Sequence, residues 1–259
     1  MASQFGICDL TLVPMRSSTN DRSEMVSQLL FGETFEITDR EKQWVKIRTA
    51  FDDYEGWIDE KQFQPISIAH FNIQKNQFVG SDKLAIAKSK FREVQVLMGS
   101  SIPSPAGKEF KINEEVFQFE GNYFPFADSP FTSPVSIIDS ALKFIDAPYL
   151  WGGRSLFGID CSGFTQIVFK LAGKNLKRDA NQQAEQGTTI NFMMEAKPSD
   201  LAFFENEEKK ITHVGIILSD GKIIHASGKV RIDNLDHFGI FNQENKKYSH
   251  KLRIIKRIL

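Results

Sequence analysis

The sequence contains little cysteine, no excess of one charge and no long hydrophobic run. Its 259 residues include only two cysteines, Cys8 and Cys161, too few for a disulfide framework. Lys and Arg number 32 and Asp and Glu 33, so the net charge of −1 creates no overall field that would attract nucleic acid or an anionic membrane. No segment approaches the roughly 18 apolar residues of a membrane helix. The composition, 41% hydrophobic, is that of an ordinary globular protein.

The first residues also lack a secretory signal. MASQFGICDLTLVPMRSSTND has no basic segment followed by an apolar stretch of about 7–15 residues. If the sequence is full length, we therefore expect a cytoplasmic protein. Cys8 lies in an apolar, strand-like stretch, where a buried and unreactive thiol is the usual outcome.

Short apolar runs separated by turn signals dominate the first half of the chain. Within residues 5–63, segments 34–38 and 44–48 alternate apolar and polar residues, which predicts half-buried strands of a small barrel. Segment 23–31 is the exception and is predicted to be a short helix or turn. Residues 64–128 predict a second small β unit, whose strand candidates are 71–78, 91–98 and 116–119.

The sequence changes character after residue 128. Residues 129–135 are predicted to be a linker, and segment 136–144 has the apolar spacing of a helix. We therefore predict four parts: a β-barrel at 1–63, a second β unit at 64–128, the linker at 129–135 and an α+β domain at 136–259.

The candidate nucleophile is Cys161, which opens a predicted helix. Gly173 is placed to end the helix. The apolar residues that follow Cys161 at helical spacing are Phe164, Ile167, Val168 and Leu171. The N–H groups and positive dipole at a helix N-terminus stabilise a thiolate, so we expect a lowered pKa for the Cys161 thiol. The alternative is an ordinary small hydrophobe at a helix start, which the polar Asp-Cys-Ser context disfavours.

A thiol nucleophile needs a general base, and the base needs a third group to fix its tautomer. Among five histidines, His213 opens the apolar strand 214–218 and His225 lies in the returning strand 222–227. His213 and His225 can therefore form a base and orienting pair. A Cys-His-His zinc site is an alternative, although it lacks a fourth ligand and the short ligand spacings of structural zinc sites. The other histidines, His70, His237 and His250, are predicted to be structural.

The two imidazoles can face the same thiol only in one strand register. Faces alternate along a strand and cross-strand partners share a face, so pairing Ile216 with His225 would turn the histidines apart. We therefore predict that Gly215 pairs with His225 across a three-residue loop, formed by a type I turn and a left-handed Gly221.

Several runs together carry a family resemblance: YLWGG, GIDCSGF, RDANQQAEQG, DLAFF, HVGIIL and IIHASG. Over residues 136–259 they resemble the NlpC-type papain-like cysteine peptidases. The resemblance implies Cys161 as nucleophile, His213 as base and His225 as the third polar residue. It also places Tyr149 beside the nucleophile, where its hydroxyl would support the oxyanion. Within these runs, Asp179 and Gln182 predict a capping box rather than a substrate contact.

The first half, with VPMRSSTNDRSEMVSQLLFGE and YEGWI, resembles bacterial SH3-like barrels fused to one branch of that family. Those enzymes, also called dipeptidyl-peptidase VI, cleave γ-D-glutamyl-L-diamino-acid bonds in murein peptides. The resemblance implies that the first barrel caps the active site and reads a free amino terminus. Glu24 and Tyr54 from the barrel, with Asp160 and Ser162 beside the nucleophile, would then bind substrate. Carboxylates suit an ammonium, from which they accept charge-assisted hydrogen bonds.

We therefore expect two small SH3-like β-barrels followed by an α+β papain-like catalytic domain. The expected reaction is amide hydrolysis through an acyl-enzyme, with a murein tripeptide or tetrapeptide as substrate. We expect no cofactor, no metal, no nucleic-acid or membrane partner, and a monomer. Two alternatives remain: an exported hydrolase of intact peptidoglycan, and a wall-peptide binding protein that has lost activity. The intact Cys, His, His set disfavours the second.

Overall fold

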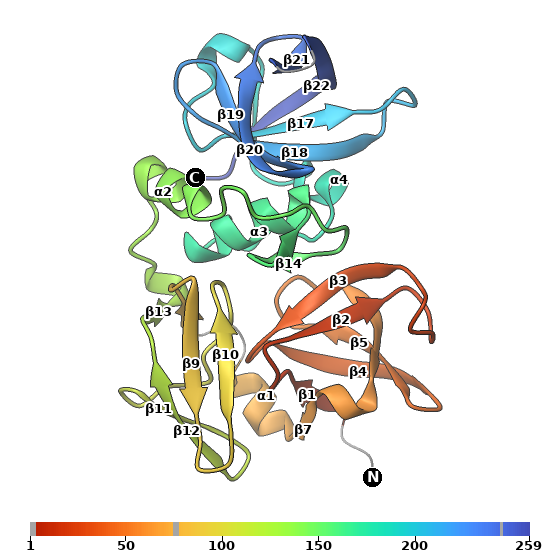
Figure 1. Cartoon of the computed structure of the whole chain (residues 1–259), viewed down its shortest axis with the longest axis vertical. Helices are drawn as coiled ribbons and strands as arrows, with labels where there is room; N and C mark the ends of the chain where they lie inside the picture. The colour runs from red at the N-terminus through yellow and green to blue at the C-terminus, as the bar shows by residue number, and fades with distance from the viewer. Residues whose placement is uncertain (1–3, 75–77, 244–245) are drawn as a thin grey trace. The chain divides into compact units, whose positions relative to one another are not determined.

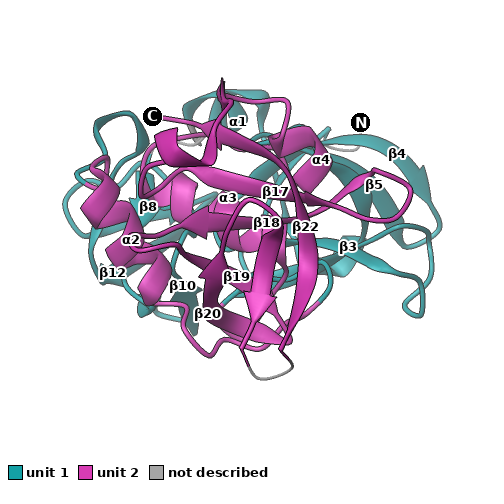
Figure 2. Cartoon of the chain, turned by 90° about the horizontal axis from the view of Figure 1, so that it is seen from above, with its two compact units in different colours: residues 1–130, 151–155 teal, residues 131–150, 156–259 magenta. Residues whose placement is uncertain are grey.

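The computed structural model describes residues 4–74, 78–243 and 246–259, and its contacts divide the chain into two compact units. The first unit comprises residues 1–130 and 151–155, and the second comprises residues 131–150 and 156–259 (Figure 2). Segment 151–155 thus belongs to the first unit, although the residues on both sides of it belong to the second. The four-part division drawn from the sequence stays a prediction.

The first unit begins with a seven-stranded antiparallel sheet, drawn in red to orange in Figure 1. Its strands are β1 (Phe5–Ile7), β2 (Leu12–Arg16), β3 (Met25–Leu30), β4 (Thr34–Glu41), β5 (Trp44–Thr49), β6 (Glu55–Asp59) and β7 (Gln64–Ile66), in the order β3-β2-β6-β5-β4-β1-β7. Alternate apolar residues form its core, as the sequence pattern predicts; examples are Val45, Ile47 and Ile58.

One prediction for this sheet is wrong. Segment 23–31 is not a helix, because Met25–Leu30 forms β3 and pairs with β2 from Leu12↔Leu30 to Arg16↔Met25. The run MVSQLL has no strict alternation, and four of its six residues are buried. Its pairing partner decides its structure, and a local pattern cannot reveal that partner.

The rest of the first unit contains a second, four-stranded sheet. Its strands are β9 (Leu84–Lys88), β10 (Glu93–Leu97), β11 (Glu109–Ile112) and β12 (Glu115–Glu120), in the order β10-β9-β12-β11. Nearby are α1 (Ile68–Gln74), the pair β8 (Phe78–Gly80) and β13 (Tyr123–Pro125), and the short 3₁₀ helices η1 (Glu60–Gln62) and η2 (Phe126–Asp128). The strands predicted at 91–98 and 116–119 are confirmed as β10 and β12. The strand predicted at 71–78 is wrong, because residues up to Gln74 are helical; residues 75–77 lie outside the described chain.

The second unit combines helices with a closed antiparallel barrel. Its strands are β15 (Gly158–Ile159), β16 (Thr188–Ile190), β17 (Leu201–Glu205), β18 (Ile211–Ile217), β19 (Lys222–Ser227), β20 (Lys229–Leu235), β21 (Gly239–Asn242) and β22 (Lys247–Arg257); β14 (Arg154–Ser155) lies in segment 151–155. The sheet order is β16-β22-β17-β18-β19-β20-β21, and a further β22–β21 pairing closes the ring.

Three α-helices of the second unit lie together on one side of its strands (Figure 1). They are α2 (Pro134–Leu142), α3 (Cys161–Leu171) and α4 (Ala180–Gln183); a separate 3₁₀ turn is η3 (Met193–Glu195). The helix predicted at 136–144 is confirmed as α2, whose N-cap is Ser133. α3 packs against α2 and against β18 and β19, which brings the start of α3 to the histidine-bearing strands.

Candidate active site

Cys161 is the first residue of α3, as predicted. The Asp160 side chain caps the helix by accepting the N–H of Gly163 at 2.6 Å. The helix ends where expected, since Gly173 has φ +69° and its N–H bonds to the Lys170 carbonyl at 3.1 Å. All 11 residues of α3 are buried, so the helix is covered on every side rather than on one apolar face.

The Cys161 thiol lies against the backbone of β18. Sγ donates to the Thr212 carbonyl at 3.9 Å, and the Val214 N–H donates to the sulfur. The β18–β19 ladder ends at Gly215↔His225. The thiol therefore sits beyond the end of this ladder and contacts both chain neighbours of His213. Within the described residues, the Cys161 thiol makes hydrogen bonds with backbone groups and not with the His213 imidazole.

The structure brings His213 and His225 together. Nε2 of His213 lies 2.8 Å from Nδ1 of His225, and both side chains are buried. The predicted register is confirmed, because Gly215 pairs with His225. A Cβ at position 215 would lie 2.9 Å from the Cβ of His225, so only glycine leaves room for the two imidazoles to meet diagonally across the strands.

The turn that sets this register differs from the predicted type. Asp220 and Gly221 both have positive φ, +56° and +63°, and the Lys222 N–H bonds to the Ser219 carbonyl. These are the features of a two-residue type I′ turn, which Asp-Gly favours. The Leu218 N–H then bonds to the Lys222 carbonyl, so Leu218 and Ser219 both oppose Lys222. The predicted positive φ of Gly221 and a bulged hairpin are therefore confirmed, and only the type I turn is wrong.

Burial dominates the pKa values of both reactive groups. It raises the pKa of the Cys161 thiol to about 12; the charge of Asp160 adds to the rise, and the hydrogen bond from Val214 opposes it. The expected lowering of the thiol pKa is therefore wrong, because desolvation outweighs the helix end. Burial, followed by the neighbouring imidazoles of His250 and His225, holds the pKa of His213 well below 6.5. At neutral pH both groups are uncharged.

His250 lies in this cluster, a position that the sequence argument did not anticipate; its structural role stays a prediction. Its ring stacks on that of His213, with centroids 4.0 Å apart and 23° between the planes. Burial lowers the pKa of His250 to about 4. His250 comes from β22, which pairs with β17, and β17 pairs on its other side with β18, the strand of His213. The sequence offers no local signal for these long-range pairings.

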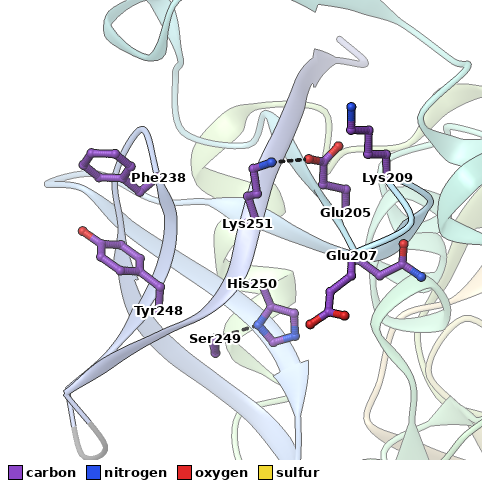
Figure 3. Close-up of a pocket in the computed structure, with 9 residues that line it drawn as sticks. Glu205, Glu207, Lys209, Phe238, Tyr248, Ser249, His250 and Lys251 are labelled. Carbon is purple, nitrogen blue, oxygen red and sulfur yellow. Dashed lines mark hydrogen bonds and ion pairs between the residues drawn. The ribbon is translucent and has the colours of Figure 1, made fainter.

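A hollow of about 680 Å³ borders His250 (Figure 3). Phe238 and Tyr248 line one side, and Glu207 and Lys209 line the other. Neither Cys161 nor His213 lines this hollow, so the hollow does not contain the thiol or the proposed base.

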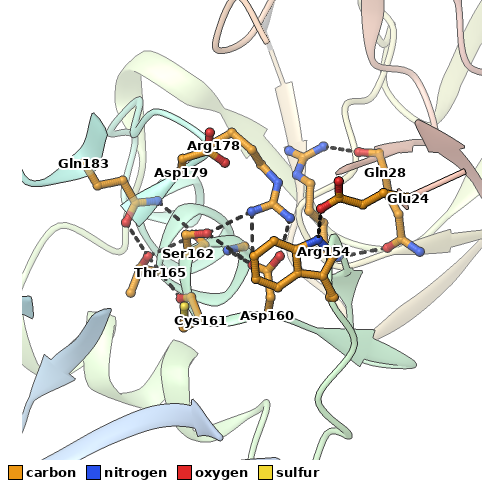
Figure 4. Close-up of polar contacts among 12 residues, drawn as sticks. Glu24, Gln28, Arg154, Asp160, Cys161, Ser162, Thr165, Arg178, Asp179 and Gln183 are labelled. Atoms are coloured by element: carbon orange, nitrogen blue, oxygen red, sulfur yellow. Dashed lines mark hydrogen bonds and ion pairs between the residues drawn. The ribbon is translucent and has the colours of Figure 1, made fainter. Parts of the chain in front are cut away.

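A buried guanidinium holds the polar residues beside the nucleophile (Figure 4). Arg178 donates to both oxygens of Asp160, at 3.0 and 2.6 Å, and to the Ser162 hydroxyl at 2.9 Å. The sequence argument missed Arg178, which lies in the run RDANQQ. The predicted capping box of the next helix, Asp179 with Gln182, is confirmed. Asp160 and Ser162 thus lie beside Cys161 with their orientations fixed by charge-assisted hydrogen bonds.

Tyr149, Glu24 and Tyr54 are found in three different settings. Tyr149 is close enough to Cys161 for the thiolate charge to act on its phenol, whose pKa burial raises to about 12. Glu24 is exposed and accepts a hydrogen bond from Trp151 Nε1 at 2.7 Å within the first unit. Tyr54 is half-buried and packs against the core of the first sheet. Their proposed roles stay predictions.

Cys8 is fully buried, as expected, and burial raises the pKa of its thiol. No group of three or more His, Cys, Asp or Glu residues in the described chain could hold a metal ion, so the zinc alternative gains no support. No helix among the described residues is both long and apolar enough to span a membrane.

A thiol at a helix N-terminus, beside a histidine that a second histidine orients, characterises a cysteine hydrolase site. Residues 146–249 match the NlpC/P60 family, and residues 15–63 match the bacterial dipeptidyl-peptidase Sh3 domain. The chain is 31% identical over 215 residues to the gamma-D-glutamyl-L-lysine dipeptidyl-peptidase of Bacillus subtilis, covering 77% of this chain and 71% of that protein. The chain belongs to the NlpC/P60 family of cysteine peptidases, and its first barrel is an SH3 domain.

Two further comparisons differ in how much of the chain they cover. The probable endopeptidase p60 of Listeria monocytogenes is 39% identical over 104 residues, 40% of this chain and 21% of that protein. The crystal structure of an NlpC/P60 family protein from Bacillus cereus covers 98% of this chain and 99% of its own, with a TM-score of 0.84 and 19% identity. At that identity the likeness concerns the fold alone.

Proposed function

We propose that this protein hydrolyses the amide bond between γ-D-Glu and a diamino acid in murein peptides that carry a free amino-terminal L-Ala. The products are the dipeptide L-Ala-D-Glu and the remaining peptide, and the role is recycling of cell-wall peptides. The observation that best supports this proposal is how much of the chain matches each relative. The match to a relative named for γ-D-glutamyl-L-lysine cleavage spans 77% of the chain, whereas the match to a p60 endopeptidase spans 40%.

The reaction is assigned to the thiol and imidazole described above. Sγ of Cys161 attacks the γ-carbonyl carbon while Nδ1 of His213 takes the thiol proton, since Nε2 of that ring is bonded to His225. The Cys161 N–H at the start of α3 and the Tyr149 hydroxyl support the oxyanion. His213 then gives its proton to the leaving amine, and water hydrolyses the thioester.

The amino-terminal dipeptide is assigned to four polar residues. We retain Glu24, Tyr54, Asp160 and Ser162 as contacts with L-Ala-γ-D-Glu. An ammonium pairs well with carboxylates, and both Glu24 and Asp160 already have their orientations fixed by neighbouring hydrogen bonds.

The proposal also covers the second β sheet of the first unit and the oligomeric state. We assign the sheet β10-β9-β12-β11, with the β8–β13 pair, to a second SH3-like unit, because it is a separate antiparallel sheet. Its buried phenylalanines share one core cluster with Ile7, Phe31 and Ile66. We assign a monomer that works without a cofactor.

Mass spectrometry of products tests the function. Three substrates are compared: the free tripeptide L-Ala-γ-D-Glu-diamino acid, its N-acetylated form and intact murein. We expect L-Ala-D-Glu from the free tripeptide and a kcat/KM at least about tenfold lower after acetylation, since tenfold corresponds to only about 1.4 kcal/mol and one hydrogen bond to a charged group contributes about 1.5–3 kcal/mol.

Two cysteine variants control the experiment. Cys161→Ala should abolish turnover, while Cys8→Ala, which alters a buried thiol of the first sheet, should leave turnover intact. Equal rates on free and acetylated peptides would show that Glu24 and Asp160 do not recognise the amino terminus of the substrate. Efficient release of fragments from intact murein would favour the alternative hydrolase, for which the p60 match is the supporting observation.

A further inference from the structure

A buried ion pair lies behind His225, on the side away from His213. Nε2 of His225 is 3.0 Å from Oδ2 of Asp233, on the neighbouring strand β20. Arg231 pairs with the same carboxylate: Nη2 donates to Oδ1 at 3.0 Å, and Nε lies 2.8 Å from Oδ2 as an ion-pair contact. His225 is 1% exposed and Asp233 6%, so the His225–Asp233 contact is shielded from water, whereas the Arg231 side chain is 20% exposed.

The charge on Asp233 follows from its partners. Burial raises the pKa of its carboxyl, but the hydrogen bonds from His225 and Arg231 outweigh burial and hold that pKa below its ordinary value. Asp233 is therefore ionised at neutral pH. An ionised carboxylate can only accept hydrogen bonds.

The acceptor-only carboxylate of Asp233 determines which ring nitrogen carries the proton, first in His225 and then in His213. Because Asp233 only accepts, Nε2 of His225 carries a proton; when that ring holds a single proton, its Nδ1 is an acceptor. Nδ1 of His225 faces Nε2 of His213 at 2.8 Å, so Nε2 of His213 must be the donor. The neutral His213 ring then has its lone pair on Nδ1.

We propose that Asp233, clamped by Arg231, is a positioning residue that fixes the tautomers of both histidines and so makes Nδ1 of His213 the base. Asp233 touches neither substrate nor thiol. When Nδ1 takes the thiol proton, the positive charge of His213 is balanced through His225 by the Asp233 carboxylate, and no proton moves to Asp233. Without that carboxylate, both imidazoles can adopt the opposite tautomer. Nδ1 of His213 then already carries a proton and cannot accept the one from the thiol.

Nitrogen-15 NMR of histidine-labelled protein tests the proposal without any substrate. At pH 7 the wild-type protein should give His213 and His225 signals of neutral rings protonated at Nε2 and bare at Nδ1. A wild-type His213 protonated at Nδ1 would overturn the proposal at once, whatever any variant does.

Asp233→Asn supplies the kinetic readout, which rests on the proposed function. We expect a reversed or mixed tautomer at His225 and a fall in kcat of about 10²–10⁴-fold with KM changed less than about threefold. The matched control is Asp220→Asn in the β18–β19 turn, which should change neither the tautomers nor kcat. Unchanged tautomers in folded Asp233→Asn protein would refute the assignment. The expected wild-type tautomers in a protein that cleaves none of the tested peptides would reject the proposed function and leave the inference intact.

Discussion

The two cysteines show how little burial distinguishes a reactive thiol from an inert one. Cys8 donates to the Leu10 carbonyl at 3.3 Å and Cys161 to the Thr212 carbonyl at 3.9 Å, and burial raises the pKa of both thiols. What sets Cys161 apart is its position beside His213. Reactivity here depends on a base that accepts the proton during attack and not on a thiolate that already exists.

This difference predicts the pH dependence of alkylation. With a thiol pKa of about 12, the thiolate fraction of Cys161 rises about tenfold per pH unit throughout the range from pH 6 to pH 9. The rate of alkylation by iodoacetamide should therefore rise about tenfold per unit without a plateau. Cys161→Ala protein, in which only the buried Cys8 remains, should not react while folded. A rate that levels off below pH 8 would mean that Cys161 rests as a thiolate paired with a protonated histidine.

At the scale of elements, the sequence predicts what depends on local periodicity and strand parity. The helix behind Cys161, the approach of His213 to His225 and the Gly215↔His225 pairing all follow from spacing alone. Asp233 and His250 could not be found in this way. Their places depend on the pairing of β20 with β19 and of β22 with β17, and these long-range pairings have no local signature.

The β18–β19 hairpin allows a deletion test of the register. Deleting Ser219 removes the bulged residue and leaves Leu218 opposite Lys222 across a regular two-residue turn, so His213 and His225 still share a face. We expect kcat/KM within about threefold of wild type. Deleting Ile217 removes a ladder residue instead and pairs Val214 with His225, which turns His213 to the other face.

The second deletion should reduce kcat/KM by at least about 10³-fold if the protein folds with the shifted register, because the base then faces away from its partner. Circular dichroism and the NMR signals of the histidines show whether the barrel is intact in each variant. Equal activity of the two deletion variants would contradict the parity argument.

At the scale of the whole molecule, a short segment from the second half of the sequence belongs to the first unit. Gly152 has φ +76°, and a Cβ there would lie 2.3 Å from the Met25 carbonyl, so the segment packs closely against β3. Arg154 also contacts β3 and a residue after it: its N–H bonds to Gln28 Oε1 of β3 at 2.8 Å (Figure 4). Its Nη1 and Nη2 lie 2.7 and 3.0 Å from the Glu33 carboxylate. The sequence could not predict this packing, because YLWGGRS lies within the run that resembles the peptidase domain.

The Arg154–Glu33 pair provides the test of this packing. Both side chains are 3% exposed, so removing one partner leaves a buried charge without compensation. Arg154→Met and Glu33→Gln should each lower the free energy of unfolding of the first unit by about 3–5 kcal/mol, and the double variant should lose much less than the sum. The exposed pair Arg48–Glu55, 46% and 36% exposed, is the matched control, and Arg48→Met should leave the unfolding transition nearly unchanged.

The three tryptophans make the measurement specific to this unit. Trp44, Trp57 and Trp151 all belong to the first unit, so their fluorescence during urea unfolding follows that unit and not the barrel that carries the histidines. Because Trp151 is in the same segment as Arg154, its environment also reports whether the segment leaves the sheet before the unit unfolds. If Arg154→Met left the fluorescence transition unchanged, the buried pair would not hold segment 151–155 in the first unit. A shift of the transition in Arg154→Met, with none in Arg48→Met, is the result expected from the burial of the two pairs.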